Sequence, residues 1–261
     1  MQAYEHARRA TQGARHYQED MAAVHVLAHT SATADARARL LVAVLADGMG
    51  GHAGGDVASR IVCQDFLAGF DATPFDMATP ERLLSALGTC NAALADKVAA
   101  EPLLSGMGST VIGALLGPDG IEWVSVGDSP LFLYRRGEVA SLNADHSLAP
   151  ELDRLASAGH MTRQAALSDP RRHMLRSALT GEEIEMIDLA RQPVALYDGD
   201  YVILASDGVQ TLDNEEIARV VAAYADAGPA AVADALIRAV EALRMPHQDN
   251  ATVVVVRPVW S

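Results

Sequence analysis

The segment LLVAVLADGMGGH, residues 40–52, joins an unbroken apolar run to an acidic residue and a glycine-rich loop. The run from Leu40 to Ala46 is too continuous for a strand with one solvent-exposed face. It therefore predicts a strand that is buried on both faces and ends at Asp47. A helix is expected next, because apolar residues between Val57 and Phe70 recur at helical spacing.

On either side of this segment the pattern alternates between groups of strands and pairs of helices. Strands are predicted at 21–29, 109–116, 121–126, 131–134, 139–142, 201–206 and 251–257, and helices at 56–70, 79–98, 213–225 and 229–244. Thr79 is the expected cap of the second helix, and the spacing of Asp213 and Glu216 fits a capping box. The short middle strands with turns between them indicate an antiparallel meander. This order predicts an α+β fold, in which two sheets pack face to face and helices cover them.

The composition limits the classes of protein to which the chain can belong. The chain has 261 residues, 50% of them hydrophobic and 21% charged, and no linker divides it, so we expect one compact domain over residues 1–261. A net charge of −14 without a basic stripe argues against nucleic-acid binding. No apolar run is long enough for a membrane helix and no secretory signal is evident, so we expect a cytoplasmic protein. Cys63 and Cys90 are expected to be small buried side chains.

Four aspartates stand at the ends of predicted strands: Asp47, Asp128, Asp207 and Asp249. A single Asp-Gly pair is most often turn chemistry. Four carboxylates that meet in one cleft would repel one another unless a cation lay between them. Carboxylate, carbonyl and water oxygens suit Mg²⁺ or Mn²⁺, and no Cys/His cluster offers a zinc site. Two such ions sharing a water would suit the hydrolysis of a phosphate ester.

Two further motifs allow more than one interpretation. The loop over residues 48–55 is rich in glycine, but it is neither a Walker loop nor a dinucleotide-binding fingerprint. Arg15 lies shortly before Glu19 and Asp20, where it could clamp a phosphate. The alternative is a solvated surface cluster.

In chain order, the motifs resemble the bacterial metal-dependent serine/threonine protein phosphatases of the PP2C type, the PPM family. The segments are GARHYQED at 13–20, DGMGGHAGGDVAS at 47–59, GST at 108–110, VGDS at 126–129, DHS at 145–147, ASDG at 205–208 and QDNAT at 248–252. The resemblance implies an α-β-β-α sandwich of two mainly antiparallel sheets with helix pairs outside. It also implies a flap at about residues 145–180, beside the cleft.

The resemblance further implies a metal site. Asp47 would bridge two Mn²⁺ or Mg²⁺ ions, the carbonyl of Gly48 would bind one of them, and Asp207 and Asp249 would complete the second site. Asp128 would share a weaker third ion with Asp207.

The remaining motif residues would act around those ions. Glu19 and Asp20 would hold metal-bound waters. Arg15 would bind the substrate phosphate, and His52 would protonate the leaving serine or threonine oxygen. The other histidines considered, His146, His160 and His173, fall in the expected flap, where exposed or packing roles are predicted.

The implied reaction is hydrolysis of phosphoserine and phosphothreonine on proteins by a metal-bridging hydroxide, without a phosphoenzyme intermediate. A phosphorylated protein is the expected partner, and a Ser/Thr kinase is a natural example; nothing requires more than a monomer. The chain departs from the family at Gln18, at Pro130, over 175–181 and over 245–248, but none of these positions is an expected metal ligand.

Two alternatives stay open. A pseudo-phosphatase would bind phosphoproteins without hydrolysing them. A phosphotransferase with an aspartate nucleophile would need a second Asp two residues after Asp47, where this chain has Met49.

Overall fold

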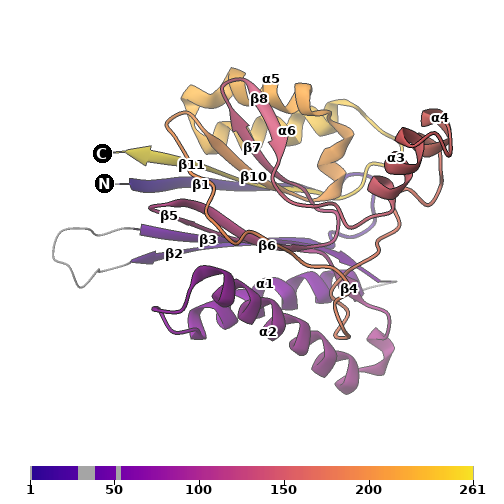
Figure 1. Ribbon diagram of the computed structural model, residues 1–261, viewed down its shortest axis with the longest axis horizontal. Helices are drawn as coiled ribbons and strands as arrows, with labels where there is room; N and C mark the ends of the chain where they lie inside the picture. Colours follow the sequence, from indigo (N-terminus) through magenta and orange to yellow (C-terminus); the bar gives the residue numbers. More distant parts are fainter. Residues whose placement is uncertain (1, 29–38, 51–53, 261) are drawn as a thin grey trace.

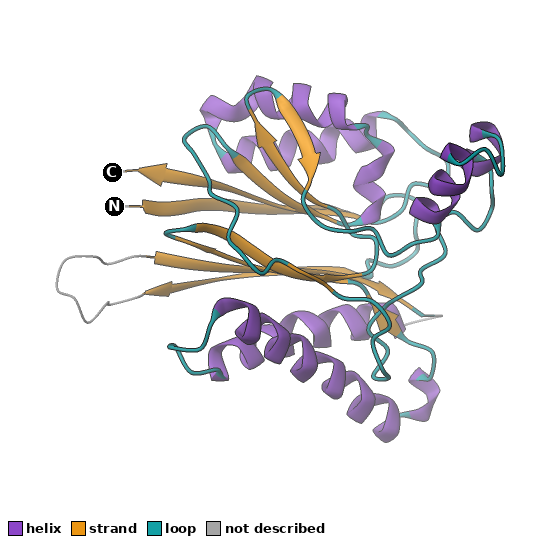
Figure 2. Ribbon diagram, in the orientation of Figure 1, coloured by secondary structure: helices purple, strands orange, loops and turns teal. Residues whose placement is uncertain are grey.

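The computed structural model of the protein describes residues 2–28, 39–50 and 54–260. Its elements form four layers, in the order helices, sheet, sheet, helices (Figures 1 and 2). Both sheets contain only antiparallel pairs. The α-β-β-α sandwich expected from the sequence is therefore confirmed.

The first sheet has the strand order β1-β11-β10-β7-β8. Its strands are β1 (Gln2–Thr11), β7 (Leu131–Arg135), β8 (Glu138–Ser141), β10 (Tyr201–Ala205) and β11 (Ala251–Trp260). The helices α5 (Asn214–Tyr224) and α6 (Pro229–Ala242) cover its outer face (Figure 1).

The second sheet has the order β2-β3-β5-β6-β9, with β4 paired to β3. Its strands are β2 (Asp20–Ala28), β3 (Arg39–Met49), β4 (Gly108–Ser109), β5 (Val111–Gly117), β6 (Gly120–Val126) and β9 (Asp188–Leu189). The helices α1 (Gly54–Ala72) and α2 (Thr79–Ala100) cover the face turned away from the first sheet (Figure 1).

The remaining elements are short. The helices α3 (Ala149–Ser157) and α4 (Arg163–Leu167) lie together at one end of the sandwich (Figure 1). Three 3₁₀ turns complete the set: η1 (Pro102–Leu104), η2 (Asp207–Thr211) and η3 (Ala225–Ala227). None of the helices in the described part of the chain is long and apolar enough to cross a membrane.

Strand β3 is buried on both faces, as its apolar run predicts. Val42 and Val44 face the core between this sheet and the helix pair α1–α2. Leu41, Ala43 and Leu45 face the core between the two sheets. A third core lies between the first sheet and α5–α6. Cys63 and Cys90 are buried and unpaired, as expected.

Three predictions about elements need correction. Strand β1 was not predicted, because its sequence QAYEHARRAT places charged residues on a sheet edge. The middle strands are not one meander: β5–β6 lies in one sheet and β7–β8 in the other, so residues 127–130 cross between the sheets. Thr79 is the first residue of α2 rather than its cap, which is Ala78. The capping box of Asp213 and Glu216 is present as predicted.

Close packing of α1 on the second sheet depends on Gly113 in β5. A Cβ atom at this position would lie 2.0 Å from Cζ of Phe66, a fully buried side chain of α1. The aromatic ring therefore occupies the space that any larger residue would need. This contact fixes how closely the helix layer approaches the sheet.

We predict that Gly113→Ala lowers the free energy of unfolding by about 1–3 kcal/mol, because the added methyl group overpacks the core. Gly88→Ala is the matched control, since a Cβ at the exposed Gly88 of α2 meets nothing within 4 Å. The control is expected to stabilise by roughly 0.5–1 kcal/mol through helix propensity. Urea unfolding of both variants measures the difference, and equal stabilities would contradict the packing argument.

Candidate active site

Asp47 stands where β3 leaves the core, and its backbone is held on both sides. Its N–H donates to Thr110 Oγ1 at 3.1 Å. Its carbonyl accepts from the N–H of Thr110 at 2.9 Å and from Ser109 Oγ at 3.0 Å. The antiparallel register of β2 and β3 also places Asp20 directly opposite Asp47. The position of the Asp47 carboxyl is thus fixed by strand pairing, by Ser109 of β4 and by Thr110, which follows it.

The other three aspartates reach the same place from different elements. Asp128 lies in the crossing between the sheets, Asp207 is the first residue of η2 after β10, and Asp249 precedes β11. All four line one cleft with a volume of about 420 Å³. The complete lining is Arg15, Tyr17, Glu19, Asp47, Gly48, Met49, Gly50, Thr110, Asp128, His173, Leu175, Asp207, Asp249 and Asn250. The convergence of acidic strand ends predicted from the sequence is present in the structure.

Crowding and burial raise the pKa values of these carboxyls. Desolvation, followed by the charges of Asp20, Asp207, Asp128 and Asp249, holds the pKa of Asp47 well above its ordinary value. Burial, with the charges of Asp207 and Asp145, raises the pKa of Asp128 to about 7. Burial and the charge of Asp249 raise the pKa of Asp207, although a hydrogen bond with Asp47 offsets part of this rise. A cluster of this kind favours any cation that neutralises it.

Arg15 is an arginine among the residues that line the cleft. Its guanidinium forms an ion pair with the Asp249 carboxylate, and its side chain is 54% exposed. The hydrogen bond from Arg15 to Asp249 is the largest cause that raises the pKa of Arg15, and the charges of Asp207 and Glu19 contribute less. Arg15 therefore lines the same cleft as the four aspartates and is not part of a separate surface cluster. Its role as a phosphate clamp stays a prediction.

Glycine at position 48 permits the tight contact between the end of β3 and the start of α1. A Cβ atom there would lie 1.9 Å from the carbonyl oxygen of Gly55, so no side chain can be accommodated. The Gly48 N–H donates to the Glu19 carbonyl at 3.1 Å. The Glu19 N–H in turn donates to Asn250 Oδ1 at 2.8 Å. These contacts join three of the segments that carry acidic residues of the cleft, those of Glu19, Asp47 and Asp249.

Glu19 and Asp20 occupy different environments. Glu19 lines the cleft, and burial raises its pKa. Asp20 is not among the lining residues: it is buried behind the cleft, where Ser206 Oγ donates to its Oδ2 at 2.7 Å. Burial raises the pKa of Asp20 to about 6, and its Oδ1 has no hydrogen-bond partner among the described residues.

Several residues of the cleft were not assigned a role from the sequence. Tyr17, Thr110 and Asn250 lie inside quoted motifs, so motif position alone was the signal that could have found them. His173, expected to be exposed or to pack, is exposed but also lines the cleft, where its charge lowers the pKa of Asp207. His146 is buried, as a packing role requires. His52, the expected general acid, lies outside the described residues.

The donor set of the cleft fits a hard divalent ion. Its carboxylate and carbonyl oxygens come from Asp47, Gly48, Asp128, Asp207 and Asp249, and oxygen donors suit Mn²⁺ or Mg²⁺. Across residues 2–28, 39–50 and 54–260, no group of three or more His, Cys, Asp or Glu side chains is arranged to hold an ion as it stands. One oxygen of Asp249 is engaged by Arg15. Binding therefore requires side-chain adjustment, with carbonyl or water oxygens completing the shell.

The chain is similar in sequence to a family of known phosphatases. A family model described as protein phosphatase 2C matches residues 13–243. The serine/threonine protein phosphatase PstP of Mycobacterium tuberculosis is 36% identical over 221 residues, which are 84% of this chain and 40% of that protein. The chain thus spans about two fifths of the length of this curated relative.

Solved structures agree with the sequence comparison. The crystal structure of M. tuberculosis PstP has a TM-score of 0.76 and 32% identity to this chain, and 97% of each chain is covered. The catalytic domain of PstP in complex with two manganese ions has a TM-score of 0.76 and 31% identity, with both chains fully covered.

We predict that Asp128→Asn stabilises the metal-free protein near neutral pH. The folded-state pKa of Asp128 is about 7 against an ordinary value of 3.8, so the folded state binds more protons between these values. Stability is therefore lost as pH rises through that window, and an uncharged side chain avoids the loss. At about pH 7.5 in EDTA the variant should melt roughly 2–4 °C higher, which corresponds to about 1 kcal/mol in a domain of this size.

Thermal unfolding in EDTA at about pH 5 is the control, because the difference between variant and wild type should shrink when Asp128 is protonated. Added Mn²⁺ should stabilise the wild type more than the variant. A variant that melts below the wild type at both pH values would show that crowding of the carboxyls is not costly.

Proposed function

Because the chain belongs to the protein phosphatase 2C family, we propose that it is a metal-dependent phosphatase that hydrolyses phosphoserine and phosphothreonine on proteins. The observation that carries the proposal is the convergence of Asp47, Asp128, Asp207 and Asp249 in one cleft that also holds Arg15. Repelling carboxylates beside a guanidinium suit a site for divalent cations and a phosphoryl group.

The proposed cofactor is a pair of Mn²⁺ or Mg²⁺ ions. Asp47 and the Gly48 carbonyl, with Asp207 and Asp249, are the proposed ligands, and Asp128 with Asp207 would hold a weaker third ion. When bound, such ions supply Lewis-acid stabilisation of phosphoryl charge and lower the pKa of a bound water. The manganese ions bound to the PstP catalytic domain support this choice.

The protein's own residues bind the phosphate and orient the reaction. Arg15 already points its guanidinium into the acidic cleft, where it can pair with phosphate oxygens as it now pairs with Asp249. Glu19 lines the same cleft and can orient water, and Asp20 supports the site from behind through Ser206. On sequence grounds alone, His52 is the proposed acid that protonates the leaving oxygen.

We also propose that water attacks directly, without a covalent phosphoenzyme, and the state of the Thr110 hydroxyl in the cleft supports this. Thr110 Oγ1 accepts the hydrogen bond of the Asp47 N–H and lies 2.7 Å from Ser129 Oγ. A buried hydroxyl committed in this way is a poor nucleophile, and no base lies beside it among these partners. Water therefore remains the proposed nucleophile.

The proposed partner is a phosphorylated protein, of which a Ser/Thr kinase is one example. We also propose that residues 145–180 form a flap beside the cleft within a single phosphatase domain. Two observations support this: α3 and α4 fall in this segment, and His173 and Leu175 line the cleft.

The proposed activity is tested with a phosphothreonine peptide in Mn²⁺, in Mg²⁺ and in EDTA. Turnover is expected with either metal and not in EDTA. Asp207→Asn and Asp47→Ala should each reduce the rate by at least about 10²-fold, because each removes a proposed ligand. Metal-independent turnover, or variants that keep half of the wild-type rate, would refute the proposed site. Binding of the peptide without turnover would favour a pseudo-phosphatase, and a trapped phosphoaspartate would favour a phosphotransferase.

We predict that Arg15→Ala raises KM more than it lowers kcat. The reason is that the guanidinium of Arg15 is proposed to bind the phosphate in the ground state, and the variant loses this contact. A charge-assisted contact of this kind corresponds to a roughly 10–100-fold rise in KM. Arg15→Lys, which keeps the charge but loses the bidentate geometry, should be intermediate. Mn²⁺ titration of both variants controls for an effect through Asp249. A pure kcat defect would contradict this role.

A further inference from the structure

A second groove continues from the catalytic cleft over the segment that follows α4. Its volume is about 580 Å³, and it shares Met49, His173 and Leu175 with the lining of the cleft. A polypeptide with its phosphorylated residue in the cleft must continue onto neighbouring surface. We call this second groove the glutamate groove. Because it shares lining residues with the cleft, the two form one continuous path for a substrate polypeptide.

Near the cleft, the glutamate groove has an apolar floor. Met174 is 58% exposed, and Leu175 and Ala178 lie beside it in the lining. An exposed methionine beside a binding cleft can adapt to differently shaped partner side chains. This part of the groove suits an apolar side chain of the bound segment.

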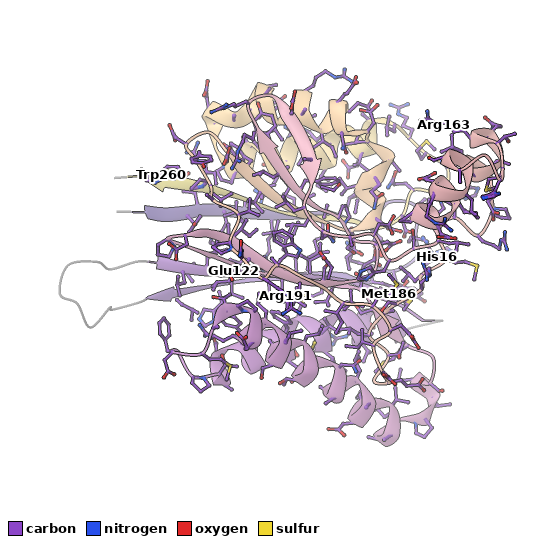
Figure 3. The ribbon with its side chains drawn as sticks, viewed as in Figure 1. His16, Glu122, Arg163, Met186, Arg191 and Trp260 are labelled. Carbon is purple, nitrogen blue, oxygen red and sulfur yellow. The ribbon has the colours of Figure 1, made fainter. Side chains whose placement is uncertain are left out.

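The far wall of the groove is a loop held by two side chains. Ser177 Oγ accepts from the N–H of Met186 at 2.9 Å and donates to its carbonyl at 2.9 Å, so the loop closes on itself. Asn91 of α2 donates to the Glu182 carbonyl at 2.7 Å and accepts from the Gly181 N–H at 3.0 Å. Figure 3 places Met186 at the same end of the molecule as His16, the neighbour of Arg15. The two hydrogen bonds of Asn91 thus attach this wall to helix α2.

This wall presents three carboxylates to the groove. Glu182, Glu183 and Glu185 are exposed and line it, and within the described residues their side chains form no ion pair. Arg176 lines the same groove, so the lining carries three acidic residues against one arginine, apart from His173. Unpaired carboxylates on a fixed wall are complementary to cationic side chains.

We infer that the glutamate groove binds a basic segment of the phosphoprotein substrate, next to the phosphorylated serine or threonine. The inference rests on the proposed function. An apolar side chain of the substrate packs on Met174 and Leu175, and lysine or arginine side chains beyond it pair with the three glutamates. The groove thereby gives the enzyme a preference among phosphoproteins that the phosphate site itself cannot supply.

The test compares two phosphothreonine peptides, one with lysines flanking the phosphorylated residue and one with glutamates in those places. The triple variant Glu182→Gln, Glu183→Gln, Glu185→Gln removes the charge and keeps the side-chain size. For the basic peptide its KM should rise roughly tenfold, the sum expected of three exposed charge pairs, with kcat within about twofold. The preference of the wild type should weaken with added salt.

Two controls isolate the groove. Hydrolysis of p-nitrophenyl phosphate, which is too small to reach the glutamates, should be the same in the triple variant and the wild type. The control triple Asp76→Asn, Asp119→Asn, Glu138→Gln removes three exposed charges outside the cleft and the groove, and should leave the basic-peptide KM unchanged. Equal KM values for the two peptides in the wild type, or equal changes in both triples, would overturn the inference.

Binding of the same peptides by fluorescence anisotropy separates this inference from the proposed function. Absence of turnover with both peptides and with p-nitrophenyl phosphate would refute the phosphatase activity. Under that outcome, tighter binding of the basic peptide, lost in the glutamine triple alone, would still support the groove. Equal binding of the two peptides would overturn it.

Discussion

The burial of residues 40–46 of β3 on both faces is the constraint on which the rest of the structure depends. An apolar strand with no solvent-exposed face needs a packed layer on each side, and here α1–α2 and the first sheet supply them. Its backbone groups pair with β2 and β5, which fixes the register of both neighbours. The strand leaves the core at Asp47, so the same burial that organises the sandwich also places the first carboxyl of the cleft.

The crowded carboxyls of the cleft lower the stability of the ligand-free fold, and bound cations are proposed to offset this cost. Four aspartates reach one site from the ends of both sheets, and burial with mutual repulsion raises the pKa of Asp47, Asp128 and Asp207. Only Arg15 among the lining residues is a permanent cation, and it is bound to Asp249. Without a bound ligand, the fold with these carboxyls is less stable than the same fold with neutral side chains in their places. Such a local loss of stability is common at functional sites.

The proposed chemistry and the proposed selectivity use different parts of the molecule. The acidic cleft is set by strand ends and by backbone hydrogen bonds at Asp47, so its geometry follows from the two sheets. The glutamate groove is set by a loop tied to α2 through Asn91. The loop joins the second sheet through the backbone hydrogen bonds between Leu179 and Ser109. The three glutamates lie on its exposed part, so their charges can change without altering those bonds.

From the sequence alone, local features could be determined: the buried strand at 40–46, the capping box of Asp213 and the four acidic strand ends. These signals depend on residues close together in the chain, where periodicity and hydrogen-bonding propensity act directly. Strand β1 was not found, because an edge strand with charged residues lacks that signal. Only the tertiary structure decided that residues 127–130 cross between sheets, that Arg15 pairs with Asp249, that Asp20 lies behind the cleft and that His173 lines it. Such contacts join residues far apart in the chain, and they are selected by the packing of whole layers, which no local pattern encodes.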